Sequence, residues 1–270
     1  MTLDYEKWKQ EHAPLLATFP HKKVLMLFTG GKDSSVILWM LLKASREFGF
    51  SFETSTGRYP LQVYPDAEVE KLDTYWRNQG VEIKWHEVDA SDELLSKAQL
   101  RGENPCPLCH SMKRTRLLSH LKVLEYELRD IVVILSFSLW DLVSYSIEYL
   151  VEGVYNVQST AEHEQRMLVT SHRFYPVTQL KNGLTVFKPL LKYNNQEILQ
   201  TVTKHGLPLS QVECPFKRYT PKRILFDYYQ QVNASFDYNQ VFSYVRNSFR
   251  IHELAMSNDM STPESIKAIL

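Results

Sequence analysis

The sequence predicts an α/β fold in which a parallel sheet is covered by helices on both faces. Short apolar runs alternate with amphipathic stretches through the first half of the chain, which is typical of parallel strands joined by helical crossovers. The most strand-like run, residues 131–135 (IVVIL), is continuous and rich in β-branched residues, as in a sheet with both faces buried. A chain of 270 residues that is 44% hydrophobic is long enough to form one large domain around such a core.

The expected elements follow this alternation in order. Apolar or alternating runs predict strands at residues 24–28, 50–54, 81–88 and 131–135. Apolar spacing and stop signals predict helices at residues 4–18, 35–48, 66–79, 91–100 and 111–128. Runs at 174–180 and 184–190 flank Asn182-Gly183, which predicts a hairpin. Further helices are expected at residues 194–205, 220–232, 238–254 and 263–270.

These elements predict an N-terminal helix within residues 1–21, a main domain at 22–215 and a helical extension at 216–270 in the same globule. The 31 basic and 31 acidic residues balance, so a nucleic-acid-binding surface would have to be local. The N-terminus lacks the apolar segment of a signal peptide. The chain has only three cysteines, an odd and small number that favours a reducing compartment. We therefore expect a cytoplasmic protein.

Residues 28–35 (FTGGKDSS) lie between a predicted strand and a predicted helix. Helix N-termini present unpaired N–H groups and a positive dipole end to anions. Gly30 and Gly31 allow the backbone to curl so that its amides converge on a pyrophosphate, and Thr29 and Ser34 add hydroxyl donors. The segment therefore predicts a phosphate-binding loop.

Two positions exclude a Walker A loop. That motif requires a glycine where Met26 stands and a serine or threonine where Asp33 stands. The simpler alternative is a surface turn whose polar residues only cap the next helix. The order of strand, loop and helix favours the phosphate loop, in which Lys32 supplies a cation.

The loop resembles the S-G-G-x-D-S motif of PP-loop ATP pyrophosphatases, with Thr29 keeping the hydroxyl of the usual serine. The resemblance implies a five-stranded parallel sheet of the adenine nucleotide α-hydrolase (HUP) type. It also implies cleavage of ATP between its α and β phosphates, with Mg²⁺ neutralising the phosphate charge, and transfer of AMP to a carbonyl oxygen. Lys32 and Asp33 would act in catalysis. The phosphate-binding residues would be Thr29, Gly30, Gly31, Lys32, Asp33, Ser34 and Ser35.

The three cysteines form a second pattern. Cys106 and Cys109 make a C-x-x-C pair just ahead of a predicted basic helix, and Cys214 follows much later. The pair alone fits a redox dithiol, half a zinc site or an iron–sulfur anchor. His110 could complete a Cys3His zinc set, although adjacent ligands are geometrically awkward. Three thiolates without a fourth ligand match a 4Fe–4S cluster with one open iron better.

Together these motifs resemble the tRNA 2-thiocytidine synthetase branch of the PP-loop enzymes. The likeness extends from residue 22 to residue 225, through residues 64–66 (YPD) and 188–191 (KPLL). In that branch three cysteines hold a 4Fe–4S cluster, which implies Cys106, Cys109 and Cys214 as ligands. The leading hypothesis is an ATP-dependent sulfurtransferase that adenylates a carbonyl oxygen, most simply of a tRNA base, and replaces it with sulfur.

The sequence departs from the family after the fourth predicted strand. The family has G-H-H-x-D-D there, whereas residues 136–141 read SFSLWD and keep only Asp141. Asp141 could ligate magnesium or activate the substrate, or it could cap the following helix. The missing histidines and the neutral charge favour a second hypothesis, adenylation of a small molecule. A third is a non-catalytic nucleotide-binding protein with a structural zinc site.

Basic residues follow both cysteine segments. If the cysteines converge, these charges converge with them, which would suit a tRNA backbone or an anionic small substrate. As isolated runs they would be solvated helix faces. These residues are Lys113, Arg114, Arg116, Lys217, Arg218, Lys222 and Arg223. The sequence specifies neither the sulfur donor nor the oligomeric state, for which a homodimer is one option.

Overall fold

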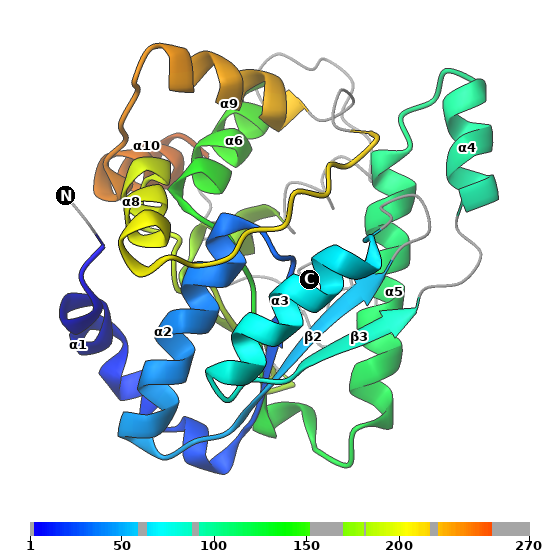
Figure 1. Cartoon of the computed structure of the whole chain (residues 1–270). Coiled ribbons are helices and arrows are strands. Elements are labelled where there is room, and N and C mark those ends of the chain that lie inside the picture. The colour runs from blue at the N-terminus through cyan, green and yellow to red at the C-terminus, as the bar shows by residue number, and fades with distance from the viewer. Residues whose placement is uncertain are drawn as a thin grey trace.

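The computed structural model describes residues 3–58, 64–87, 92–151, 170–180, 182–216 and 221–249. Its strands are β1 (Lys23–Leu27), β2 (Phe52–Arg58), β3 (Ile83–Glu87), β4 (Ile131–Ile134), β5 (Val177–Gln179) and β6 (Thr185–Phe187). They form one sheet in the order β3-β2-β1-β4-β6-β5. All neighbours pair in parallel except β5 and β6, which are antiparallel. Helices flank this sheet (Figure 1).

Most helices lie close to the predicted positions, and α6 is one for which no range was predicted. They are α1 (Tyr5–Leu16), α2 (Lys32–Phe48), α3 (Asp66–Asn78), α4 (Asp92–Leu100), α5 (Cys106–Val123), α6 (Leu139–Leu150), α8 (Asn195–His205), α9 (Pro221–Gln231) and α10 (Tyr238–Phe249). Short 3-10 helices are η1 (Phe19–His21), η2 (Leu128–Asp130) and η4 (His172–Phe174). The helix expected at 263–270 lies outside the described residues. In the described part, no helix has the length and apolarity needed to cross a membrane.

One boundary differs from the prediction in a way that matters for the cysteines. Helix α5 begins at Cys106 rather than at residue 111, so the C-x-x-C pair forms its first turn. Pro107 is tolerated there because the first N–H groups of a helix need no intrahelical acceptor. The Cys109 N–H donates to the Pro105 carbonyl, 3.0 Å away, which closes the turn. The predicted start at residue 111 was therefore wrong, because proline interrupts a helix interior but is accepted in the first turn.

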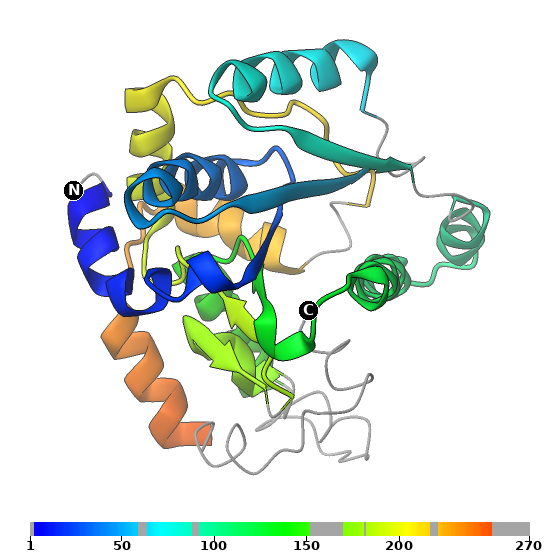
Figure 2. The same ribbon diagram turned by 90° about the horizontal axis from the view of Figure 1, so that it is seen from below.

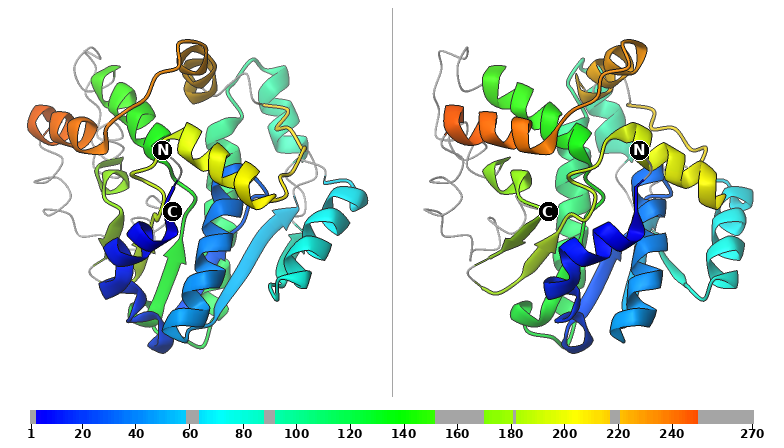
Figure 3. Two further views of the ribbon diagram at one scale, coloured as in Figure 1. Left: turned by 60° about the vertical axis from the view of Figure 1, so that its left-hand side comes forward. Right: turned by 90° about the vertical axis from the view of Figure 1, so that its left-hand side faces the viewer.

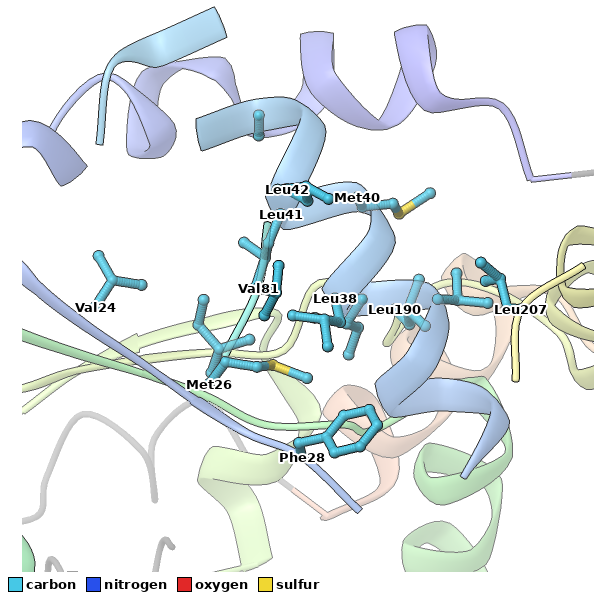
Figure 4. Packing of buried hydrophobic residues seen from close by; sticks show 14 of the residues in the cluster. Val24, Met26, Phe28, Leu38, Met40, Leu41, Leu42, Val81, Leu190 and Leu207 are labelled. Atoms are coloured by element: carbon cyan, nitrogen blue, oxygen red, sulfur yellow. The ribbon is translucent and has the colours of Figure 1, made fainter. Parts of the chain in front are cut away.

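The core has two layers because strand residues alternate between the faces of the sheet. Val24 and Met26 of β1 pack with buried residues of α1, α2, α3 and α8. Figure 4 shows both side chains on the side of β1 that faces α2. Leu25 packs on the opposite face, in a cluster that includes Leu121 of α5. Figure 2 accordingly shows α1 and α2 on one side of the sheet and α5 on the other.

The C-terminal helices pack on α6 rather than on the sheet. Val245 of α10 is fully buried beside Leu139 and Leu142 of α6. Helix α9 also contacts α6, and Trp140 lies edge-on to Phe226 of α9. Figure 3 shows α10 alongside α6 in both views. Helix α6 begins just after β4, at the carboxyl side of the sheet. The contacts with α6 therefore hold α9 and α10 on that side.

The five-stranded parallel sheet expected from the resemblance is wrong in one respect. The sheet has six strands, and its edge strand β5 runs antiparallel to β6. The predicted Asn182-Gly183 hairpin causes this difference. The Leu180 N–H donates to the Leu184 carbonyl at 2.9 Å, and Gly183 has a φ of 89° that suits glycine. The resemblance described the shared parallel strands, whereas the local turn signal predicted the additional edge strand.

We expect Gly183→Ala to destabilise the fold. A Cβ at this position would overlap the Cβ of Arg129 and lie 2.6 Å from its Cα, in a backbone conformation that alanine rarely adopts. The strain and the overlap together should lower the free energy of unfolding by about 3 kcal/mol. Urea denaturation measures this loss. Gly206→Ala is the control, because Gly206 has a φ of 58° but no described heavy atom within 4 Å of the added carbon. Equal losses in the two variants would contradict the packing argument.

Candidate functional site

The loop between β1 and α2 is held in place from two sides. The Tyr64 hydroxyl donates to the Thr29 carbonyl at 2.9 Å, and the Ser34 Oγ accepts from the Thr29 N–H at 3.2 Å. Gly30 has a φ of 66°, a left-handed conformation that favours glycine. Gly31 is the N-cap of α2 and has no side chain to bond the first N–H groups of that helix. The loop therefore presents a helix N-terminus without a side-chain cap, which suits an anion.

The two predicted catalytic residues of the loop pair with each other. The Lys32 Nζ lies 2.7 Å from both carboxylate oxygens of Asp33. Both side chains are partly exposed, and ion pairs of this kind are weak in water. A polyphosphate, which carries more negative charge than one carboxylate, can therefore replace Asp33 as the partner of Lys32.

The chain that follows α8 runs along the phosphate loop toward the start of α5 (Figure 1). The Ser210 N–H donates to the Gly30 carbonyl at 2.8 Å, and the Ser35 hydroxyl donates to the Pro208 carbonyl at 3.1 Å. A Cβ added to Gly30 would lie 2.9 Å from the Ser210 Cβ. Cys214 follows four residues after Ser210. One short segment therefore joins the phosphate loop to the third cysteine, a contact that local sequence patterns did not predict.

The structure brings the three cysteines toward one another. Cys106 and Cys109 lie one helical turn apart at the start of α5. The Cys106 Sγ lies 3.9 Å from the Phe216 carbonyl oxygen, close in sequence to Cys214. Burial raises the pKa of the Cys109 thiol, Lys113 opposes that rise, and the neighbouring Cys214 and Cys106 thiols add to it. None of the three cysteines forms a disulfide, and Cys214 is exposed.

The structure leaves the choice between a metal cluster and a single metal ion at these thiols as a prediction. Among the described residues, no three histidine, cysteine, aspartate or glutamate side chains are grouped to hold one ion. The Cys3His zinc set with His110 therefore stays an untested alternative. A 4Fe–4S cluster is larger than one ion and is anchored by thiolates around it. Thiols from two distant segments, none of them in a disulfide, are the kind of donor set that such a cluster uses, and the assignment of Cys106, Cys109 and Cys214 as ligands stays a prediction.

Asp141 lies in the first turn of α6. Its Oδ2 accepts from the Ser138 N–H at 2.9 Å and from the Ser138 hydroxyl at 3.2 Å. Only 4% of Asp141 is exposed. The structure thus shows the capping role, with Ser138 as the N-cap and Asp141 as the third helical residue. Magnesium binding or substrate activation by Asp141 stays a prediction.

We expect Asp141→Ala to lower the free energy of unfolding by about 1–2 kcal/mol, because the buried Ser138 N–H loses its acceptor. Asp141→Asn keeps an acceptor oxygen and should lose less stability. Urea denaturation of both variants checks these losses, and pyrophosphate release by the asparagine variant checks chemistry separately. A stable Asp141→Asn protein without pyrophosphate release would assign Asp141 a catalytic role beyond capping.

The predicted basic residues are only partly brought together. Arg116 of α5 and Arg223 of α9 are exposed, whereas Lys113 and Arg114 of α5 are half-buried. Burial, and then the charge of Arg173, lowers the pKa of Arg114. The side chains that fall outside the described part are those of Lys217, Arg218 and Lys222. The joint convergence of all seven charges stays a prediction.

Comparison with known proteins supports the sequence resemblance. No family model matches the chain. A tRNA-cytidine(32) 2-sulfurtransferase from Francisella tularensis is 33% identical over 92 residues, which cover 34% of this chain and 34% of that protein. A tRNA-cytidine(32) 2-sulfurtransferase from Xanthomonas campestris is 32% identical over 101 residues, covering 37% of this chain and 33% of that protein. The match therefore spans about a third of the length of these relatives.

A solved structure shares the fold. The U34-tRNA thiolase NcsA from Methanococcus maripaludis, solved with its [4Fe-4S] cluster, superposes with a TM-score of 0.62. Its sequence is 16% identical, and the alignment covers 98% of this chain and 88% of the thiolase. The α/β architecture is thus common to both chains. The resemblance to PP-loop tRNA sulfurtransferases is confirmed by these comparisons.

Proposed function

We propose that this chain is an ATP-dependent, iron–sulfur-dependent sulfurtransferase that adenylates a carbonyl oxygen of a tRNA base and replaces it with sulfur. The supporting observation is the segment that contacts Gly30 through Ser210 and then carries Cys214 toward Cys106. Nucleotide binding and sulfur chemistry would therefore meet at one place. The two bacterial relatives are named as tRNA sulfurtransferases, which supports tRNA as the substrate.

The phosphate loop would bind ATP and orient it for adenylation. The N–H groups at the start of α2 would donate to the phosphates, and Lys32 would exchange Asp33 for a phosphate partner. Asp33, once released, would be free to ligate Mg²⁺. The carbonyl oxygen of the substrate would attack the α-phosphorus and expel pyrophosphate. The resulting adenylate makes that oxygen a leaving group as part of AMP.

Cys106, Cys109 and Cys214 would hold the 4Fe–4S cluster. When bound through three thiolates, such a cluster supplies one iron without a protein ligand, where a sulfur atom can be carried. Burial raises the pKa of Cys109 overall, and Lys113 reduces that rise, which eases formation of the thiolate that metal binding requires. A reducing cytoplasm would keep the three thiols available for the cluster.

The tRNA part of the proposal predicts salt-dependent binding. Arg116→Ala with Arg223→Ala should reduce the slope of log affinity against log salt by about two, since each lost phosphate contact removes about one unit. Both side chains are exposed, so their removal should leave ATP affinity unchanged. tRNA affinity across a salt series measures this slope. Arg77→Ala, on α3, is the control and should bind like the wild type. Salt-insensitive or absent tRNA binding by the wild type would contradict the tRNA assignment.

Adenylation of a small molecule is the second candidate. The position that carries histidines in the family holds a helix cap here, Ser138 with Asp141, and the chain has no net charge. A compact substrate would displace few counterions, so the salt series distinguishes it from tRNA. A structural zinc site in a non-catalytic nucleotide-binding protein would instead be identified by metal analysis of protein purified without oxygen.

A further inference from the structure

A buried lysine stands directly after β6. Lys188 is 1% exposed, and its Nζ lies 3.3 Å from the Thr178 Oγ1 and 3.4 Å from the His172 carbonyl oxygen. An ammonium group has three donors, so these two long hydrogen bonds leave one donor unused. Among the described residues, no carboxylate lies within ion-pairing distance of Lys188. A lysine buried in this way is costly in its charged form.

A second cation lies beside it. The guanidinium of Arg173, in η4, lies 4.8 Å from the centroid of the Tyr145 ring. Its Nε is buried and has no hydrogen-bond partner in the described part of the chain. Burial, and then the charge of Arg173, lowers the pKa of Lys188 to about 7. The His172 carbonyl oxygen, 3.4 Å from the Lys188 Nζ, belongs to the peptide bond that leads into Arg173, which places the two cations in neighbouring positions.

Two cations, Arg173 in η4 and Lys188 after β6, thus lie close together without a described acidic partner. We propose that Arg173 and Lys188 form a binding site for a tetrahedral oxyanion of the phosphate class. Such an anion supplies the acceptors that these donors lack. Guanidinium groups bind oxyanions through paired hydrogen bonds, and an ammonium group adds a compact charge.

The location in the sheet also favours a ligand site. Strands β1, β4 and β6 are neighbours and parallel. The phosphate loop follows β1, and Lys188 follows β6, so both lie at the carboxyl edge. Ligands of open α/β sheets bind at this edge. The proposed oxyanion site therefore lies on the same edge of the sheet as the phosphate loop, after a different strand, and it does not depend on sulfur transfer.

Phosphate titration by calorimetry tests this site on the full chain purified without oxygen. Inorganic phosphate should bind the wild type at two places and the Gly30→Val variant, whose phosphate loop is disabled, at one. Adding Arg173→Met or Lys188→Met to Gly30→Val should weaken that remaining site at least tenfold. Lys192→Met is the matched control, because Lys192 lies on the same segment, is only partly buried and pairs with Glu11. In the Gly30→Val background it should leave phosphate affinity unchanged.

A second comparison covers the case in which the Gly30→Val protein fails to fold. Arg173→Met alone should then reduce two bound phosphates to one in otherwise wild-type protein. Unchanged phosphate binding in folded Arg173→Met and Lys188→Met variants would overturn the site and leave Lys188 as a neutral buried lysine. A short oligoribonucleotide identifies the source of the anion. If the oligoribonucleotide displaces the phosphate, the site binds a backbone phosphate. If the oligoribonucleotide and phosphate bind together, the site binds the free ion.

Discussion

Gly30→Val should weaken ATP binding at least 100-fold, or by about 3 kcal/mol. The backbone φ of 66° disfavours any side chain by about 1–2 kcal/mol. The added Cβ would also lie 2.9 Å from the Ser210 Cβ and so displace the segment that holds the loop. Isothermal titration with ATP, together with a pyrophosphate-release assay, measures the loss. Unchanged ATP affinity in a folded variant would contradict the phosphate-loop assignment.

Two other glycines separate the causes of this loss. Gly49→Ala introduces similar backbone strain at a φ of 71° but has no described atom within 4 Å of the new carbon, so it should cost stability and not ATP affinity. Gly31→Ala has room within the protein, since its Cβ would lie 3.4 Å from the Thr29 Oγ1 at a φ of −77°. A large loss of ATP binding in Gly31→Ala would therefore report a close approach of phosphate to that backbone.

Cys214→Ala should abolish cluster assembly while leaving ATP affinity within about twofold of the wild type. One missing thiolate leaves two anchors, and the chain has no fourth cysteine to replace it. Iron content should fall from about four atoms per chain to nearly none. Cys106→Ala and Cys109→Ala should give the same result, because both thiols lie in the same turn of α5.

Ser111→Ala is the control for the cysteine variants, because it changes a small polar side chain in the same helix without removing a thiol. It should retain the cluster absorption of the wild type. A Cys214→Ala protein with a normal 4Fe–4S spectrum would show that Cys214 is not a ligand. A wild type that contains zinc and no iron would remove the cluster from the account.

Local patterns predicted most of the strands, helices and the loop because each depends on neighbouring residues. The phosphate loop needs only a strand, two glycines and a helix start in order, and the structure has β1, Gly30, Gly31 and α2 in that order. The resemblance implied only five strands because it described the shared ones, whereas the Asn182-Gly183 turn signal predicted the antiparallel edge pair. The start of α5 was expected at residue 111 rather than at Cys106, because a proline such as Pro107 normally interrupts a helix.

The contacts that assemble the site could not be predicted in this way. Ser210 meets Gly30 and Cys106 approaches Phe216 only because the sheet brings distant segments together. Lys188 looked like a residue of a family motif, and its burial beside Arg173 depends on how η4 packs against the end of β6. Contacts between distant positions are set by the tertiary structure, and periodicity and motif spacing carry no information about them.

The most direct measurement combines metal analysis with nucleoside mass spectrometry on the wild type, prepared without oxygen and incubated with tRNA, ATP, Mg²⁺ and sulfide. The account predicts iron and acid-labile sulfide in the protein, and one tRNA nucleoside heavier by the exchange of oxygen for sulfur. That product should require ATP and should disappear with Cys214→Ala or Gly30→Val. Iron-loaded protein that binds ATP but leaves every tRNA nucleoside unchanged would contradict sulfur transfer to tRNA.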